Sequence, residues 1–125
     1  MQKKELQDTV VLVKKFLSSM EDRNLILAKS FLGENFKLVF PGNQTFSTIE
    51  EVTFWAKNRY HWVKKNYNHF DSLTTNNIVI VYCYGTLYGE SLDGTKFSEI
   101  RFIDRFTLKE KILEQLVWND LAEYK

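Results

Sequence analysis

The chain has 125 residues, of which 44% are hydrophobic and 26% are charged, and its formal net charge at pH 7 is +1. This length and balance predict a single globular domain over residues 1–125, with room for a hydrophobic core. The near-neutral charge argues against a nucleic-acid partner, since binding to phosphates usually requires a basic excess.

Cysteine content and hydropathy narrow the cellular setting. The sequence contains one cysteine, Cys83, so no disulfide can form within the chain and a reducing compartment is favoured. The first residues lack the apolar run of a signal peptide, and no later run is long enough to span a membrane. We therefore expect a cytoplasmic protein that has no membrane partner.

The first part of the chain predicts two helices. Apolar residues recur at helical spacing between lysines and glutamates, which predicts an amphipathic helix over about residues 3–21. Asp22 or Asn24 can cap a second, short helix. Gly33 is typical of a helix C-terminus, so this helix is expected to end there.

A strand and a third helix follow. Residues 36–40 alternate in polarity and are closed by Pro41-Gly42, which predicts a strand and a turn. Ser47 stands three residues before Glu50, and this capping-box spacing predicts a helix over about residues 48–60. Trp55 lies on the apolar face of that helix.

The remaining chain predicts four strands in a meander, over residues 64–73, 77–89, 96–108 and 112–120. Asp93-Gly94 suits a two-residue hairpin turn. The order is helix, helix, strand, helix and then four strands. It predicts an α+β fold in which three helices pack on a curved, mainly antiparallel sheet.

The turn lengths predict which residues face the helices. A two-residue turn at Asp93-Gly94 places Cys83 opposite Asp104, and a two-residue turn at Lys109-Glu110 places Asp104 opposite Gln115. The predicted inner face consists of alternating residues of three strands: Val81, Cys83, Leu87, Ile100, Phe102, Asp104, Phe106, Leu113, Gln115 and Val117. A carboxylate among apolar side chains is costly, so we expect the pKa of Asp104 to rise unless a donor compensates.

The opposite face of the same strands is rich in tyrosine and arginine. It carries Tyr84, Arg101 and Trp118. Arg101 is expected to lie opposite Trp118 on the neighbouring strand. An amphipathic surface of this composition is typical of a protein–protein interface. We expect a homodimer through this face.

The two residues Tyr67 and His69 are two apart, so they are expected to share one face of a strand. Their facing depends on the loop at residues 74–77. A two-residue loop places them on the outer face with Tyr84, and a three-residue loop places them with Cys83 and Asp104. The two histidines of the chain lack the spacing of a metal site, and Lys64-Lys65 is expected to face solvent.

Three stretches of the sequence carry a resemblance to a known family: "EDRNLILAKSFLGENFKLVFPGN", "STIEEVTFWAK" and "GTLYGESLDGTKFSEIRFIDRFTLKEKILEQLVWND". They resemble the nuclear transport factor 2-like superfamily, and within it the SnoaL-like proteins. The matching positions are an acidic residue before the second helix, a strand ending in Pro-Gly, an Arg-x-x-Asp-x-Phe pattern, and a last strand ending in Asp: Asp22, Pro41-Gly42, Arg101, Asp104, Phe106 and Asp120.

The resemblance implies a cone-shaped α+β barrel, often dimeric through its sheet, with a pocket between sheet and helices. In the enzymes of that superfamily an inward carboxylate transfers protons, and Asp104 matches its position. This chain has Lys109-Glu110 where many relatives have an Asp-Gly turn, so the turn before the last strand departs from the pattern.

Two functions remain open from the sequence. The first is binding of a small apolar or aromatic molecule, with isomerase, cyclase or dehydratase chemistry through Asp104 and His69 and without metal or cofactor. Its expected ligand-binding residues come from one helix and four strands: Trp55, Tyr67, Cys83, Phe102, Phe106, Gln115 and Val117. The second is a non-catalytic dimeric module whose aromatic side chains fill its own pocket.

Overall fold

The computed structural model describes residues 3–121, with side chains from residue 6 onward. Within that range the chain forms three helices: α1 (Lys3–Glu21), α2 (Leu25–Lys29) and α3 (Ile49–Lys57). In the same range it forms six strands: β1 (Leu32–Phe40), β2 (Gln44–Phe46), β3 (Tyr60–Thr75), β4 (Ile78–Ser91), β5 (Lys96–Lys109) and β6 (Lys111–Asn119). None of the helices in this range is both long enough and apolar enough to cross a membrane.

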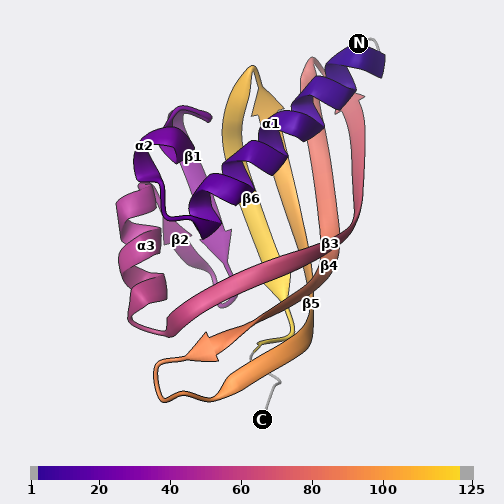
Figure 1. Cartoon of the computed structure of the whole chain (residues 1–125). Coiled ribbons are helices and arrows are strands. Elements are labelled where there is room, and N and C mark those ends of the chain that lie inside the picture. The colour runs from indigo at the N-terminus through magenta and orange to yellow at the C-terminus, as the bar shows by residue number, and fades with distance from the viewer. Residues whose placement is uncertain (1–2, 122–125) are drawn as a thin grey trace.

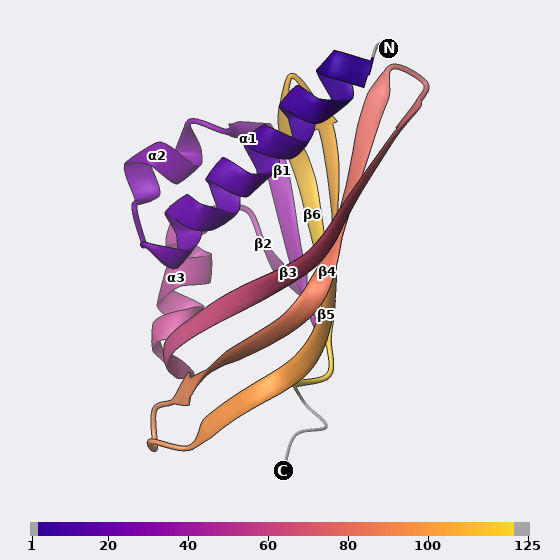
Figure 2. The same cartoon turned by 45° about the vertical axis from the view of Figure 1, so that its right-hand side comes forward.

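The strands form one curved sheet, and all three helices lie on the same side of it (Figures 1 and 2). The strand order is β2-β1-β6-β5-β4-β3. β1 and β6 are parallel, and the other neighbouring strands are antiparallel. This confirms the predicted α+β fold, although over residues 3–121 the edge strands β2 and β3 do not join, so the cone stays open.

The first two helices begin where the sequence predicts, but α2 ends earlier. Of the two expected caps, Asn24 is used, and its side-chain oxygen accepts a hydrogen bond from the backbone N–H of Leu27 at 3.2 Å. The prediction that Gly33 ends this helix is wrong. Gly33 lies in β1, because the chain already pairs with β6 at Leu32, opposite Ile112.

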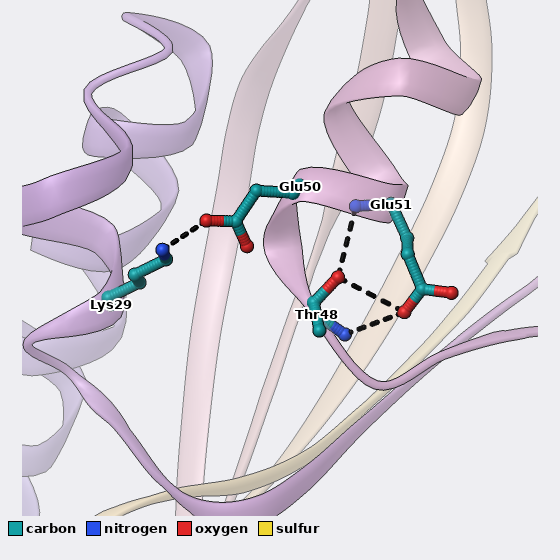
Figure 3. A network of polar contacts seen from close by, with 4 residues as sticks. All are labelled: Lys29, Thr48, Glu50 and Glu51. Carbon is teal, nitrogen blue, oxygen red and sulfur yellow. Dashed lines mark hydrogen bonds and ion pairs between the residues drawn. The ribbon is translucent and has the colours of Figure 1, made fainter.

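The cap of α3 lies one residue beyond the predicted one (Figure 3). Thr48, not Ser47, accepts from the backbone N–H of Glu51 at 3.1 Å, and the Glu51 carboxylate accepts from the Thr48 N–H at 3.0 Å. Glu50 instead forms an ion pair with Lys29 of α2. The expected helix was also too long at its end, and the short strand β2 was not expected.

The central hairpin has the predicted register around the candidate carboxylate. Cys83 lies opposite Asp104, as the Asp93-Gly94 turn predicted. Nearer the turn a β-bulge shifts the pairing by one residue, so Lys96 lies opposite Glu90 rather than Ser91. The two-residue loop at Asn76-Asn77 joins β3 to β4, and both asparagines have positive φ, as a tight hairpin turn requires.

The last hairpin differs from the predicted register by two residues. Asp104 lies opposite Val117, not Gln115, because Glu110 alone turns the chain, with a φ of 67°, and a bulge between Thr107 and Leu108 adds a second residue to the shift. A shift of two preserves the faces, so Gln115 and Val117 are still buried on the inner side. Between that bulge and the turn, however, Ile112 is buried where Leu113 was expected.

The core lies between the inner face of the sheet and the apolar face of α1. Val13, Phe16 and Leu17 of α1 are buried against that face. The rings of Phe16 and Phe106 meet edge to face, with centroids 6.2 Å apart. This packing covers the middle of the inner face, close to where Asp104 lies.

Candidate ligand-binding site

A buried ion pair marks the inner face of the sheet. The ammonium Nζ of Lys65 on β3 donates to Oδ2 of Asp104 on β5 at 2.6 Å. The Asp104 side chain is fully buried, and that of Lys65 is 17% exposed. The same ammonium lies 4.7 Å from the centroid of the Phe102 ring, a cation–π contact. Asp104 therefore has a donor that the sequence did not identify.

Lys65 reaches this position because of the alternation along β3. Val63, Lys65 and Tyr67 are each partly buried, whereas the residues between them are exposed. The expectation that both residues of Lys64-Lys65 face solvent is therefore wrong for Lys65. The period-two pattern was present in the sequence, but the general preference of lysine for solvent masked it.

The two charges of this pair stabilise each other. Burial raises the pKa of Asp104, while the Lys65 ammonium and then the Gln115 side chain oppose that rise. Burial alone would lower the pKa of Lys65, but the Asp104 carboxylate outweighs it and the pKa of Lys65 lies above its ordinary value. Lys65 is therefore a fixed cation at neutral pH.

A cavity of about 190 Å³ lies next to this ion pair, between the end of α1 and strand β3. Most of its wall is apolar, from Phe16, Leu17 and Met20 on α1 to Val63 on β3. Lys65, Tyr67, Gln115 and Glu21 bring polar atoms to it. A small, mainly apolar cavity with a few convergent polar groups has the usual composition of a ligand site.

Two further polar groups belong to this cavity. The carboxylate of Glu21, at the end of α1, accepts a hydrogen bond from the backbone N–H of Lys65 at 3.2 Å. Partial burial raises the pKa of Glu21. The Tyr67 hydroxyl is buried and has no hydrogen-bond partner within the described residues. Burial also raises the pKa of Tyr67, so its hydroxyl keeps its proton. Glu21 is an exposed residue, and its contact with the Lys65 amide, 44 residues away in the chain, had no signal in the sequence.

Tyr67 and His69 lie on opposite faces of β3, although they are two residues apart. A β-bulge between them places Tyr67 opposite Gly85 and His69 opposite Tyr84. His69 is thus on the outer side, where its Nε2 lies 2.8 Å from a carboxylate oxygen of Asp71. The loop has two residues, one of the two expected lengths, but the expectation that the two side chains share a face is wrong.

Gly85 makes the bulge possible. A Cβ atom at this position would lie 2.0 Å from the carbonyl oxygen of Asn66 on β3. Only glycine lets the two backbones approach so closely. The direction of Tyr67 into the cavity, and of His69 away from it, therefore depends on a residue of the neighbouring strand.

The structure brings together only some of the expected ligand-binding residues. Tyr67 and Gln115 line the cavity. Four others lie around Asp104 beneath the cavity wall and do not line it: Cys83, Phe102, Phe106 and Val117. Burial raises the pKa of Cys83 to about 12, so this thiol stays protonated. No group of three or more potential metal ligands occurs among the described residues.

Trp55 lies at a separate hollow near the other end of the sheet. Its ring packs against Phe40, Phe46 and Tyr60, and the Arg59 guanidinium lies 4.7 Å from its centroid. It lines an open hollow of about 820 Å³ rather than the cavity beside Lys65. Trp55 and Asp104 are therefore not parts of one site.

No family profile matches the sequence, and no curated protein matches it either. Solved structures do resemble it. TerC, co-crystallised with polyporic acid, has a TM-score of 0.74 and 16% identity, covering 91% of this chain and 92% of that one.

Two further solved structures support the same likeness. A candidate SnoaL-like polyketide cyclase from Jannaschia has a TM-score of 0.73 at 14% identity, covering 98% of this chain and 92% of that chain. A candidate dehydratase from the NTF2-like family of Streptomyces avermitilis has a TM-score of 0.73 at 13% identity, with coverages of 91% and 94%.

The fold and these likenesses place the chain among α+β proteins whose helices cover one side of a curved sheet. The chain has the nuclear transport factor 2-like fold, and the resemblance that the sequence motifs predicted is confirmed at the level of the fold.

Proposed function

We propose that this protein binds a small, largely apolar or aromatic molecule in the cavity beside Lys65. The observation that carries the proposal is a fixed ammonium in the wall of an apolar cavity of about 190 Å³. A buried ion pair contributes little net stability, because the loss of hydration offsets the attraction between the charges. Retaining one next to a cavity therefore favours a role in binding or chemistry.

The structural neighbours are consistent with this class of function. TerC was crystallised with polyporic acid, and two other neighbours are a candidate cyclase and a candidate dehydratase. Polyporic acid is a small organic molecule, and the other two proteins are described as candidate enzymes. At identities of 13–16% they support the kind of ligand and leave its identity open.

Acid–base chemistry of the isomerase, cyclase or dehydratase type is the second part of this proposal. Asp104 does not line the cavity, so it acts on a ligand through Lys65 rather than by direct contact. Glu21 is the carboxyl group that lines the cavity, and partial burial raises its pKa, which is the direction that proton transfer near neutral pH requires. His69 lies on the other face and takes no part.

The test is to map the binding of small aromatic molecules by NMR. Chemical-shift changes are expected around Lys65 and Tyr67. They should disappear in Met20→Trp, which fills the cavity, and persist in Ile26→Trp, a control at an exposed residue of α2 outside the cavity lining. Shift changes that centre on Trp55, or that survive Met20→Trp unchanged, would contradict the proposal.

A second candidate function rests on the outer face of the sheet, where we propose that a second copy of the chain docks. Tyr84, Ile103 and Trp118 are cross-strand neighbours, and all three are exposed. Arg101 and Asp120 beside them form an ion pair at 2.5 Å, so the surface carries charges of both signs. Such a surface can complement itself across a two-fold axis.

Light scattering at micromolar concentration tests this second proposal. We expect a dimer that becomes a monomer in Trp118→Glu. Phe54→Glu, which changes an exposed aromatic residue of α3, should leave the dimer intact. A monomeric unmodified protein would rule out the sheet interface and leave the cavity proposal untouched.

A further inference from the structure

We propose that the cavity selects weak organic acids, and that the ammonium of Lys65 and the hydroxyl of Tyr67 together bind the anionic oxygen of the ligand. This inference rests on the proposed small-molecule function and adds the chemical class of the ligand. It assigns binding roles to Lys65 and Tyr67 and a positioning role to Asp104.

Lys65 has a donor left for a ligand. An ammonium group carries three N–H donors. One N–H of Lys65 bonds Oδ2 of Asp104, and the group also contacts the face of the Phe102 ring. No other hydrogen-bond partner of the ammonium occurs among the described residues. Because the side chain lines the cavity, an oxygen of a bound molecule can accept from it.

Tyr67 supplies a second donor beside the first. Its hydroxyl is buried and makes no hydrogen bond within the described residues, an arrangement that costs free energy unless a ligand or water completes it. Tyr67 lies two residues from Lys65 on the same face of β3, and both line the cavity. An oxygen bound between them would accept one hydrogen bond from the charged ammonium of Lys65 and one from the neutral hydroxyl of Tyr67.

The cavity favours an anionic oxygen at Lys65. Of the cationic residues that line the cavity, Lys65 is the one whose side chain lies on the inner face of β3, whereas Arg23 and Lys64 are exposed. The carboxylate of Glu21 in the same lining is held by the backbone N–H of Lys65. The mainly apolar wall lowers the local dielectric, so a charge on the ligand matters more here than in water.

Asp104 prepares Lys65 for this role. The ion pair fixes the ammonium at one point of the wall and keeps it charged despite its burial. Asp104 itself does not line the cavity, so it does not compete with the ligand for space. Its action on the ligand is therefore indirect.

The experiment compares 2-naphthoate, which is ionised at pH 7, with the neutral 2-naphthamide, whose shape is nearly the same. Affinities are measured by NMR titration of the full chain. The variants are Tyr67→Phe, which removes only the hydroxyl, and the double variant Lys65→Met with Asp104→Asn, which leaves no charge unpaired. Lys57→Met, on α3 and outside the cavity lining, controls for a general loss of positive charge.

We expect the unmodified protein to bind the acid about tenfold more tightly than the amide. Binding of the acid should weaken by about tenfold in the double variant and by about fivefold in Tyr67→Phe, while binding of the amide stays within about twofold. Lys57→Met should change neither. If the double variant does not fold, Tyr67→Phe decides the question alone.

Equal affinity for acid and amide in the unmodified protein would overturn the inference and leave the cavity function standing. An equal loss for both molecules in Tyr67→Phe would overturn it as well. If neither molecule bound, the proposed function and the inference would fall together.

Discussion

Two ion pairs on opposite faces of β5 have almost the same distance between nitrogen and oxygen but differ in their exposure to solvent. On the inner face, Lys65 and Asp104 lie 2.6 Å apart, with side chains 17% and 0% exposed. On the outer face, Arg101 and Asp120 lie 2.5 Å apart, with side chains 83% and 42% exposed. Distance alone would rank the two interactions as equal.

The difference in burial decides what each pair does. Water and salt screen the outer pair, and holding two long side chains in place costs entropy, so its net contribution is small. The inner pair has lost its hydration, so removing one partner leaves an uncompensated charge. The inner pair therefore constrains the folded state strongly, whereas the outer pair does not.

The largest expected effect comes from breaking the inner pair. Asp104→Ala leaves the Lys65 ammonium buried without its partner and should lower the free energy of unfolding by about 3–5 kcal/mol. Urea denaturation measures this loss. The double variant Lys65→Met with Asp104→Leu removes both charges and should recover most of it. If Asp104→Ala cost no more than a surface substitution, the claimed contrast between the two pairs would be wrong.

A thiol reagent compares the two faces directly. Burial raises the pKa of Cys83 to about 12, so only about one molecule in 10⁴ carries a thiolate at pH 8. In a Cys83→Ala background, Leu73→Cys places a thiol at an exposed position of β3, outside the proposed dimer surface. We expect it to react at least about a thousandfold faster than Cys83 at pH 8.

The same pKa shift has a consequence for stability. The native state holds the Cys83 proton more tightly than the unfolded chain does, so this group's contribution to stability falls as pH rises from about 8.5 toward 12. Denaturation at pH 8 and pH 10 should show a smaller decline for Cys83→Ala than for the unmodified protein. A steeper decline in Cys83→Ala would contradict the sign of the shift.

A substitution at Gly85 tests how the two faces are kept distinct along β3. Its new methyl group would press on the Asn66 carbonyl, so Gly85→Ala should cost about 1–3 kcal/mol and disturb the bulge that separates Tyr67 from His69. Gly33→Ala is the matched control, because its Cβ would meet a Leu113 side-chain methyl at 3.1 Å, which can move. Thermal denaturation of both variants gives the comparison.

The smallest effect is expected for the outer pair. Arg101→Ala should change the free energy of unfolding by about 0.2–1 kcal/mol, and the difference from the unmodified protein should shrink further in 1 M salt. Urea denaturation at low and high salt measures both. A loss as large as that of Asp104→Ala would show that burial does not separate the two pairs.

The pattern of the strands made much of the inner face predictable. Period-two alternation and the Asp93-Gly94 turn placed Asp104 and Cys83 opposite each other on the inner side, as observed. Gln115 was placed on the correct face although its strand was misaligned, because an error of two residues does not exchange the faces. Local alternation is therefore more robust than the register between strands.

The failures have particular causes. The facing of His69 depends on a one-residue bulge, and nothing in the sequence of β3 alone fixes its position. Trp55 was expected beside Asp104 because it is a large aromatic residue on an apolar helix face, but α3 packs over the other end of the sheet. Lys65 was assigned to solvent on the average behaviour of lysine.

The sequence by itself determined the three helices, five of the six strands of residues 3–121, the α+β class and the burial of a carboxyl group at Asp104, because these follow from local periodicity and turn chemistry. Only the tertiary structure decided that Lys65, 39 residues earlier in the chain, is its partner. That pairing depends on the curvature of the sheet, the bulge opposite Gly85 and the end of α1. These are contacts between distant segments, and no local pattern specifies them.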